Sequence, residues 1–171
     1  MPEQPVLTPE QKQMSALMEE IVDGLAKGHT LKVVHGLDEK DMEAVYGLAH
    51  SLYQSGRYDK AKSAFKFLCL YDHTEPKWWI GLGATMQRLK DFEGAVKAYA
   101  YATLMDVENP KPQLHAGYCL MALQKYDEAK CALEGTIMAC GEDPKKAEYK
   151  TQAEALLKVV AAKKGATGEG N

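Results

Sequence analysis

Apolar, small and polar positions follow one another with a helical spacing along most of the chain, and this pattern is itself repeated. It is seen in three segments, SGRYDKAKSAF (55–65), LKDFEGAVKAY (89–99) and LQKYDEAKCAL (123–133). An alanine recurs at 34-residue intervals, as Ala61, Ala95 and Ala129. An aromatic residue stands three positions before each alanine, and a bulky residue stands four positions after it: Phe65, Tyr99 and Leu133. Residues three and four apart share one face of a helix, so the pattern predicts repeated helical hairpins.

A 34-residue period with small, aromatic, alanine and bulky positions is typical of tetratricopeptide repeats. We expect three units, over residues 42–75, 76–109 and 110–143. Such helix–turn–helix units stack into a short superhelical solenoid, so the predicted fold class is all-α. Gly56 suits a left-handed residue at the end of the first helix, although Lys90 and Gln124 replace it in the next two units.

An N-terminal helical segment is predicted over residues 10–41, after a flexible stretch over residues 1–9. Thr8-Pro9-Glu10-Gln11 has the spacing of a capping box. The helix that follows has one apolar stripe, formed by Met14, Leu17, Met18, Ile21 and Leu25. The stripe could mediate dimerisation or pack on the first repeat of the same chain. A short turn, TLKVVHG (30–36), then leads to Asp38 and Asp41, either of which could cap the first repeat.

A last helix is predicted over residues 144–164, starting at Asp143-Pro144. Its apolar face contains Ala153, Leu156, Leu157 and Val160. A terminal helix of this kind covers the open end of a solenoid. The tail GATGEGN (165–171) is expected to be disordered.

Composition narrows the functional class. The net charge of −3 gives no electrostatic reason to expect nucleic acid or an anionic membrane surface as a partner. No apolar run reaches the ~20 residues that span a bilayer, and MPEQPVLTPEQ does not resemble a secretory signal. Four scattered cysteines suggest a reducing compartment, with the thiols packed in the core. We therefore expect a cytoplasmic protein.

Motifs of catalysis are missing from the sequence. The five histidines form no H-E-x-x-H, and the cysteines have no zinc-site spacing. GLGATM (81–86) lacks the third glycine of a dinucleotide loop, and its small residues suit helix packing. We predict neither enzyme activity nor a cofactor nor a metal.

Function is then expected on the concave face, which the first helix of each unit lines. The fifth, ninth and twelfth positions of these helices should face inward: Tyr46, His50, Tyr53, Ile80, Ala84, Gln87, Leu114, Tyr118 and Met121. The alternative is ordinary packing between helices. Trp79 occupies a packing position, whereas Trp78 is expected to be exposed. A clamp for a C-terminal carboxylate would need charge-assisted donors, but its positions are occupied by Tyr46, His50, Gly81 and His115, and only Lys111 matches.

The segment GHTLKVVHGLDEKDMEAVYGLAHSLYQSGRYDKAKSAFKFLCLYDH (28–73), with WIGLGATMQ (79–87) and AYAYATLMD (98–106), resembles class II type III secretion chaperones of Gram-negative bacteria. The resemblance covers about residues 10–160. It implies a cytosolic, three-repeat protein that dimerises through its N-terminal helix. It also implies a groove that holds an extended P-x-L-x-x-P-like segment of a hydrophobic translocator protein. Matching positions add Tyr71 and His73 to the groove residues, while Tyr99 matches but lies at a packing position.

The leading hypothesis is therefore an export chaperone that keeps translocators soluble and secretion-competent. An alternative is a transcriptional co-regulator, because some members of the family also bind an AraC-type activator. A further alternative is a tetratricopeptide scaffold unrelated to secretion.

Overall fold

The computed structural model describes Thr8, Pro9, Ala16, Val22, Gly24, Ala26, Lys27 and residues 29–168. Within these residues the secondary structure is helical throughout, which confirms the all-α fold class. The helices are α2 (Leu31–Val34), α3 (Glu39–Gln54), α4 (Tyr58–Tyr71), α5 (Pro76–Arg88), α6 (Phe92–Met105), α7 (Pro110–Ala122), α8 (Tyr126–Cys140), a 3₁₀ turn η1 (Pro144–Lys146) and α9 (Ala147–Gly168).

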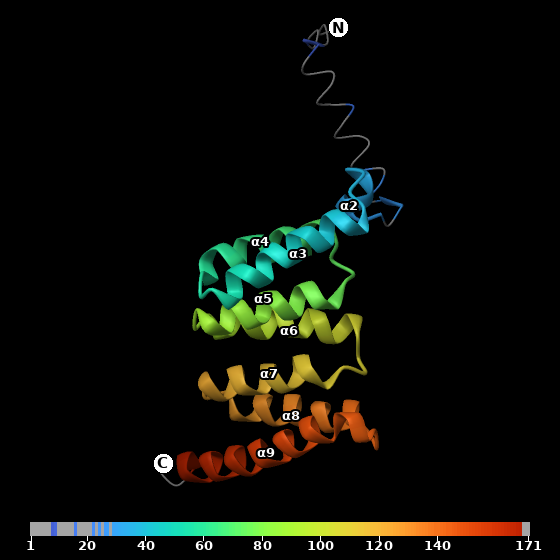
Figure 1. The fold of residues 1–171 in the computed structure, drawn as a ribbon. Helices are drawn as coiled ribbons and strands as arrows, with labels where there is room; N and C mark the ends of the chain where they lie inside the picture. Colours follow the sequence, from blue (N-terminus) through green and yellow to red (C-terminus); the bar gives the residue numbers. More distant parts are fainter. Residues whose placement is uncertain are drawn as a thin grey trace, which may run out of the picture.

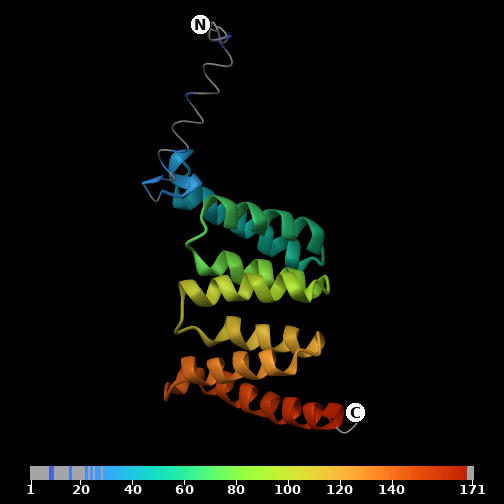
Figure 2. The same ribbon diagram turned by 180° about the vertical axis from the view of Figure 1, so that it is seen from behind.

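Three antiparallel helix pairs, α3–α4, α5–α6 and α7–α8, lie one above the other, and α9 covers the last pair (Figures 1 and 2). The short α2 lies at the opposite end, against α4. Each first helix also contacts the first helix of the next pair, so α3, α5 and α7 form a continuous layer. This layer is the face on which a groove can form.

The helices of each pair cross closely because small residues stand at the crossing points. Ala61, Ala95 and Ala129 are fully buried, as the repeated alanine predicts. A Cβ atom added to Gly83 would lie 2.7 Å from Cε1 of Tyr99, and one added to Gly117 would lie 2.8 Å from Cδ2 of Leu133. A side chain at either glycine would force the two helices apart, since packed interiors leave no room for an added methyl group.

The turns inside the three hairpins share one left-handed residue. Gly56 has φ of 74°, and the equivalent Lys90 and Gln124 have φ of 61° and 59°. In all three turns the next backbone N–H bonds a carbonyl five residues back, for example Arg57 N to Leu52 O at 2.9 Å. The predicted tolerance of this turn for other residues is confirmed, although a side chain at positive φ is less favourable than glycine.

Both aspartates that could cap the first repeat do so together. Asp38 accepts a hydrogen bond from the Asp41 N–H, and Asp41 accepts one from the Asp38 N–H, which forms a capping box. The predicted turn over residues 30–36 contains the one-turn helix α2. The apolar stripe of Met14, Leu17, Met18, Ile21 and Leu25 lies outside the described residues.

An ion pair holds α2 on the first repeat. Lys32 Nζ lies 2.7 Å from Asp72 Oδ2, and it also contacts Glu39 at 3.2 Å. Thr74 donates to the other Asp72 oxygen through its N–H and its hydroxyl. Burial disfavours the charged carboxylate, but the hydrogen bonds from Lys32 and Thr74 prevail and lower the pKa of Asp72. The pair therefore joins the chain before the repeats to the loop after α4.

The C-terminal helix α9 packs on both α8 and α7. Ala153 and Val160 are buried and Leu156 and Leu157 are half-buried, so the predicted apolar face is confirmed. Asp143 caps η1 by accepting from the Lys145 N–H. The helix continues to Gly168, beyond its predicted end at Lys164, so the expectation of disorder is wrong for residues 165–168.

Two local predictions about the core need correction. Trp78 is fully buried against Tyr46, whereas Trp79 is half-buried and donates from Nε1 to His73 O at 2.9 Å. The prediction for Trp78 is wrong because the ring of Tyr46 on α3 packs against it, a contact that the sequence pattern does not contain, whereas Trp79 packs against the core of the first repeat as predicted. Of the four cysteines, Cys131 is exposed and the other three are buried, as predicted for core packing.

Replacing Asp72 with asparagine should lower the free energy of unfolding by ~1–3 kcal/mol at pH 7, since Lys32 then loses its charged partner. The lowered pKa means that this stabilisation is present above the unfolded-state pKa of about 3.9 and is lost as the pH falls through the folded-state value. Denaturant titrations of both proteins should therefore differ at pH 7, and the difference should begin to shrink near pH 4 and disappear below the folded-state pKa of Asp72. A difference that does not change with pH would contradict the role given to the ion pair.

Candidate functional site

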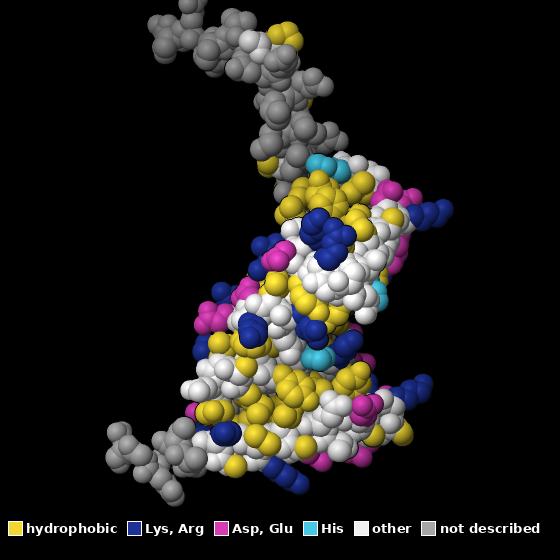
Figure 3. Space-filling view, turned by 60° about the vertical axis from the view of Figure 1, so that its left-hand side comes forward, with side chains coloured by type: hydrophobic (Ala, Val, Ile, Leu, Met, Phe, Trp, Pro, Cys, Tyr) yellow, Lys and Arg dark blue, Asp and Glu magenta, His cyan; other side chains and the backbone are white. Residues whose placement is uncertain are grey.

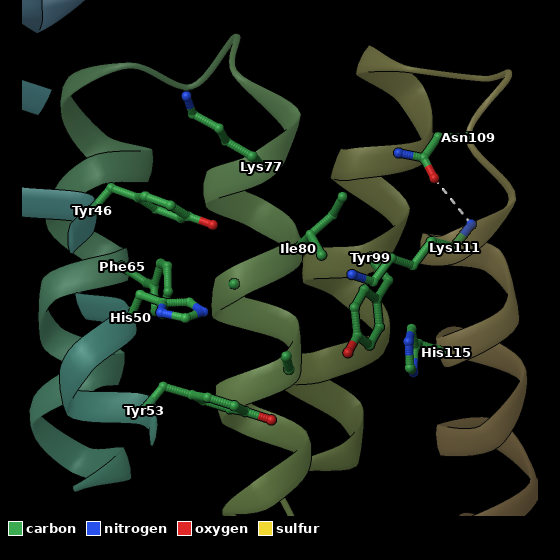
Figure 4. A pocket seen from close by; sticks show the side chains of 12 residues that line it. Tyr46, His50, Tyr53, Phe65, Lys77, Ile80, Tyr99, Asn109, Lys111 and His115 are labelled. Carbon is green, nitrogen blue, oxygen red and sulfur yellow. Dashed lines mark hydrogen bonds between the residues drawn. The ribbon is translucent and has the colours of Figure 1, made fainter. Parts of the chain in front are cut away.

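A cavity of about 440 Å³ opens on the layer of first helices, between α3, α5 and α7 (Figure 4). Its lining comes from all three repeats: Tyr46, His50, Tyr53, Phe65, Lys77, Ile80, Gly81, Ala84, Tyr99, Asn109, Lys111 and His115. Six of these residues are tyrosine, phenylalanine, isoleucine or alanine, two are histidines, two are lysines and none has a carboxylate.

The wall on α3 is formed by Tyr46, His50 and Tyr53, which succeed one another along the helix (Figure 4). Tyr46 packs on Trp78 and Phe65, with ring centroids 5.2 Å and 6.1 Å away. Tyr53 contacts the edge of Tyr58 at 5.5 Å. Both tyrosines are half-buried, so their rings are held by neighbours while part of each surface faces the cavity.

The floor of the cavity is formed by side chains from the second helices of the first two repeats, α4 and α6, which lie on glycines of α5. The Phe65 ring of α4 lies on Gly81, where an added Cβ would overlap with it. The Tyr99 ring of α6 lies on Gly83, and its hydroxyl donates to Gln87 Oε1 at 3.1 Å. Glycines on α5 thus let core rings of two repeats form part of the cavity surface.

The wall on α7 contributes His115, whose ring stacks on Tyr99 at 5.6 Å with an interplanar angle of 20°. Burial, helped by the nearby charge of Lys111, lowers the pKa of His115. Burial also raises the pKa of Tyr99. Both rings are therefore uncharged at neutral pH, and the charge in the cavity comes from the lysines.

Lys77 and Lys111 occupy the same position in successive repeats, directly after Pro76 and Pro110. The Lys77 ammonium bonds Glu43, which raises the pKa of Lys77, and it lies 4.5 Å from the centre of the Trp78 ring. The Lys111 backbone N–H donates to Asn109 Oδ1 at 3.1 Å. Both lysines lie toward the upper part of the cavity in Figure 4, while Tyr53 lies at its lower end.

Five residues predicted to face inward line the cavity together: Tyr46, His50, Tyr53, Ile80 and Ala84. Gln87 lies beside them through its bond to Tyr99. The prediction for Leu114 is wrong, because its side chain is buried with Ala153 and Val160 of α9. The C-terminal helix covers α7 much as α7 covers α5, and the inward position of the third repeat becomes core.

The remaining predicted groove residues lie elsewhere. Tyr71 stacks on Phe67 at 4.2 Å and contacts His35, while His73 is exposed near Trp79 and Tyr101. Tyr118 is exposed beside His115, with ring centroids 6.2 Å apart, and Met121 packs against the cluster around α9. None of these four lines the cavity, so a groove role for them stays a prediction.

Several lining residues were not predicted to face inward. Phe65 and Tyr99 were assigned to helix packing, and they serve the core and the cavity at once. Lys77, Lys111 and His115 stand at the second and sixth positions of their helices, which the count of inward positions left out. The equal spacing of the two lysines and the glycine at 81 were signals in the sequence that point to them.

The arrangement suits an extended peptide. Figure 3 shows hydrophobic side chains over much of one face of the repeats, with basic, acidic and histidine side chains scattered among them. Pockets lined by aromatic rings and a few polar groups bind anchor side chains of a peptide. In the described part of the chain, no three His, Cys, Asp or Glu side chains gather as metal ligands. Over the same residues, no helix has the length and hydropathy needed to cross a membrane.

Comparison with known proteins gives matches over most of the chain. The tetratricopeptide repeat family matches residues 42–74 and 76–109. Low calcium response locus protein H of Yersinia pseudotuberculosis is 29% identical over 157 residues, which is 92% of either chain. Chaperone protein SicA of Salmonella dublin is 35% identical over 116 residues, covering 68% of this chain and 70% of SicA.

Solved structures with the same architecture include a type III secretion complex from Aeromonas hydrophila, with a TM-score of 0.81 and 32% identity over 85% of this chain and 97% of the other. PcrH of Pseudomonas aeruginosa bound to the chaperone-binding region of PopD has a TM-score of 0.72 and 33% identity, covering 75% and 97%. An alternative dimer of the translocator chaperone SycD from Yersinia enterocolitica has a TM-score of 0.70 and 30% identity, covering 74% and 96%.

Replacing Gly81 with alanine should lower the free energy of unfolding by ~1–3 kcal/mol, because the new methyl group displaces the Phe65 ring from the cavity floor. Gly47 is the matched control, since it lies in α3 with nothing within 4 Å of an added Cβ. Gly47→Ala should instead raise stability by ~0.5–1 kcal/mol through helix propensity. Chemical denaturation of the three proteins measures both effects, and equal shifts for the two variants would contradict the close contact at Gly81.

Proposed function

The chain belongs to the class II type III secretion translocator chaperones, a family built from tetratricopeptide repeats, and we propose that it binds hydrophobic translocator proteins through an extended segment in the α3–α5–α7 cavity. We place this activity in the bacterial cytoplasm, before export. The family is not enzymatic, and the proposed activity is binding alone. Its clients would be the translocators of the secretion apparatus that the chain serves.

The observation that carries this proposal is the preformed aromatic cavity on the first-helix layer. Tyr46 and Tyr53 are fixed by Trp78, Phe65 and Tyr58, so their rings need little reordering when a peptide binds. A rigid groove lowers the entropy lost on association and concentrates binding energy on a few anchors. An extended segment inserted here would bury apolar side chains against Tyr46, Tyr53 and Ile80.

Binding of this kind explains how a chaperone can act without nucleotide hydrolysis. A protein destined for a membrane exposes apolar surface that promotes aggregation in water. Capture of one extended segment keeps part of that surface covered while the rest of the client stays unfolded enough for export. PcrH with its PopD region offers a precedent at 33% identity for such a complex.

We also infer that the chain forms a dimer. SycD, at 30% identity, is described as a dimer in one of its structures. The predicted apolar stripe before residue 28 would supply an interface, since a helix with such a stripe gains by covering it. The stripe lies outside the described residues, so its part in the dimer rests on the sequence pattern.

Replacing both Tyr46 and Tyr53 with alanine should weaken client binding by at least ~30-fold, because each buried aromatic anchor contributes ~1–2 kcal/mol or more. The measurement is co-purification and isothermal titration with the translocator co-expressed from the same secretion locus. Tyr101→Ala is the matched control, since Tyr101 is an exposed aromatic residue stacked on Trp79 away from the cavity.

Circular dichroism of each variant reports whether the repeats still fold. A folded double variant that binds and solubilises the translocator as the wild type does would refute the groove assignment. The single substitution Tyr53→Ala is a milder test. It removes only the contact of Tyr53 with Tyr58, and the contact of Tyr46 with Trp78 stays intact.

Introducing charges into the stripe, as Leu17→Asp with Ile21→Asp, should convert a dimer into a monomer by placing carboxylates in an apolar interface. Sedimentation velocity over a range of concentrations measures the mass of the wild type and the variant. A variant that sediments as the wild type does would show that the stripe does not hold the dimer together.

A further inference from the structure

The charged lining residues of the cavity are both cationic, in a chain whose net charge is −3. The lining residues include Lys77 and Lys111 and no aspartate or glutamate. Glu43, which does not line the cavity, forms an ion pair with Lys77. Lys111 has no ion pair with any residue in the described part of the chain. Its side chain extends toward the cavity in Figure 4.

At the start of α7, the Lys111 side chain is the main hydrogen-bond donor, because the backbone of the first turn offers no free N–H group. Helix N-termini usually offer free backbone N–H groups to an anion. Here Pro110 and Pro112 have no N–H, and the Lys111 N–H is already bonded to Asn109. What remains is the Lys111 ammonium, with the positive end of the α7 dipole behind it.

The opposite end of the cavity is apolar and aromatic. Tyr53 lies there, away from both lysines (Figure 4). Ile80 and Ala84 lie between the two ends on α5. A bound segment would therefore meet a cationic donor at one end and a ring at the other, so its two directions are not equivalent.

We propose that the groove selects an extended translocator segment with a side-chain carboxylate, aspartate or glutamate, which pairs with Lys111 while an apolar side chain of the same segment packs on Tyr53. The inference rests on the proposed function and adds the charge and the direction of the bound segment. Lys77, already neutralised in part by Glu43, contributes less than Lys111.

A side-chain carboxylate fits this site better than the C-terminus of a partner. A terminal carboxylate held by a repeat groove needs charge-assisted donors from several helices. The α3 wall offers Tyr46, His50 and Tyr53, none of them a permanent cation. A single lysine suits one side-chain carboxylate of a peptide that continues past the site.

The first test selects binders from a random peptide library displayed on phage, in which the peptides have no free C-terminus. Wild-type protein should enrich peptides with aspartate or glutamate at a fixed distance from an apolar residue. The Lys111→Met variant should lose that enrichment, and Lys111→Arg should restore it. Lys97→Met is the matched control, because Lys97 is an exposed lysine on α6 away from the cavity.

A double-mutant cycle then uses one selected peptide, synthesised with an amidated end, and its acid-to-amide counterpart. Fluorescence anisotropy should show a ~5- to 10-fold loss of affinity for the amide counterpart on the wild type, as expected for one partly exposed charge-assisted bond. On Lys111→Met the two peptides should bind alike. Equal losses on both proteins, or no enrichment of acidic residues, would overturn the inference.

The same measurements separate this inference from the proposed function. If selected peptides bind in a way that depends on Tyr53 and not on Lys111, the groove binds peptides and only the acidic preference is wrong. If no peptide binds the wild-type protein, both fail. Tighter binding of a peptide with a free C-terminus than of its amidated form would overturn the assignment to a side-chain carboxylate.

Discussion

The close approach of paired helices is the constraint on which the rest of this protein depends. Glycines at 81, 83 and 117 let Phe65, Tyr99 and Leu133 lie directly on a neighbouring helix. The contact of Tyr99 within the second hairpin and the contact of Phe65 between the first two repeats bring both rings to the cavity, so the floor of the groove is also part of the core. Core residues are fixed by many neighbours. Changes in the groove floor and changes in stability are therefore coupled, whereas the α3 wall can vary more freely.

Polar interactions act mainly at the two ends of the stack. The capping box of Asp38 and Asp41 starts α3, and the Lys32–Asp72 pair fastens α2 to the first repeat. Between repeats, Lys62 bonds Asp91, which itself caps α6 through the Gly94 N–H. The Gly94 bond, with the Lys62 contact, lowers the pKa of Asp91. The middle of the first-helix layer is left with few such pairs, and its unpaired surface is available to a partner.

The sequence predicted the structure best at positions that recur in each of the three repeats. The 34-residue period placed the buried alanines and the left-handed turns, and the helical spacing of apolar residues placed the apolar face of α9. It also placed Tyr46, His50, Tyr53 and Ile80, because α3 and α5 each have another first helix beside them. It failed for Leu114, where the neighbour is α9, and for Trp78, whose burial depends on how Tyr46 packs. Tertiary contacts between distant segments decide such positions, and a periodic pattern does not contain them.

Because α9 takes the place that the first helix of a fourth repeat would occupy, it also sets the length of the groove. Neighbouring packed helices lie ~8–10 Å apart, so the span from α3 to α7 is roughly 20 Å. An extended chain advances ~3.3 Å per residue, and about six residues would fill that span. By closing the solenoid, α9 therefore limits the length of the partner segment that this groove can hold to those few residues. The rest of a bound partner must be contacted by other surfaces or remain exposed.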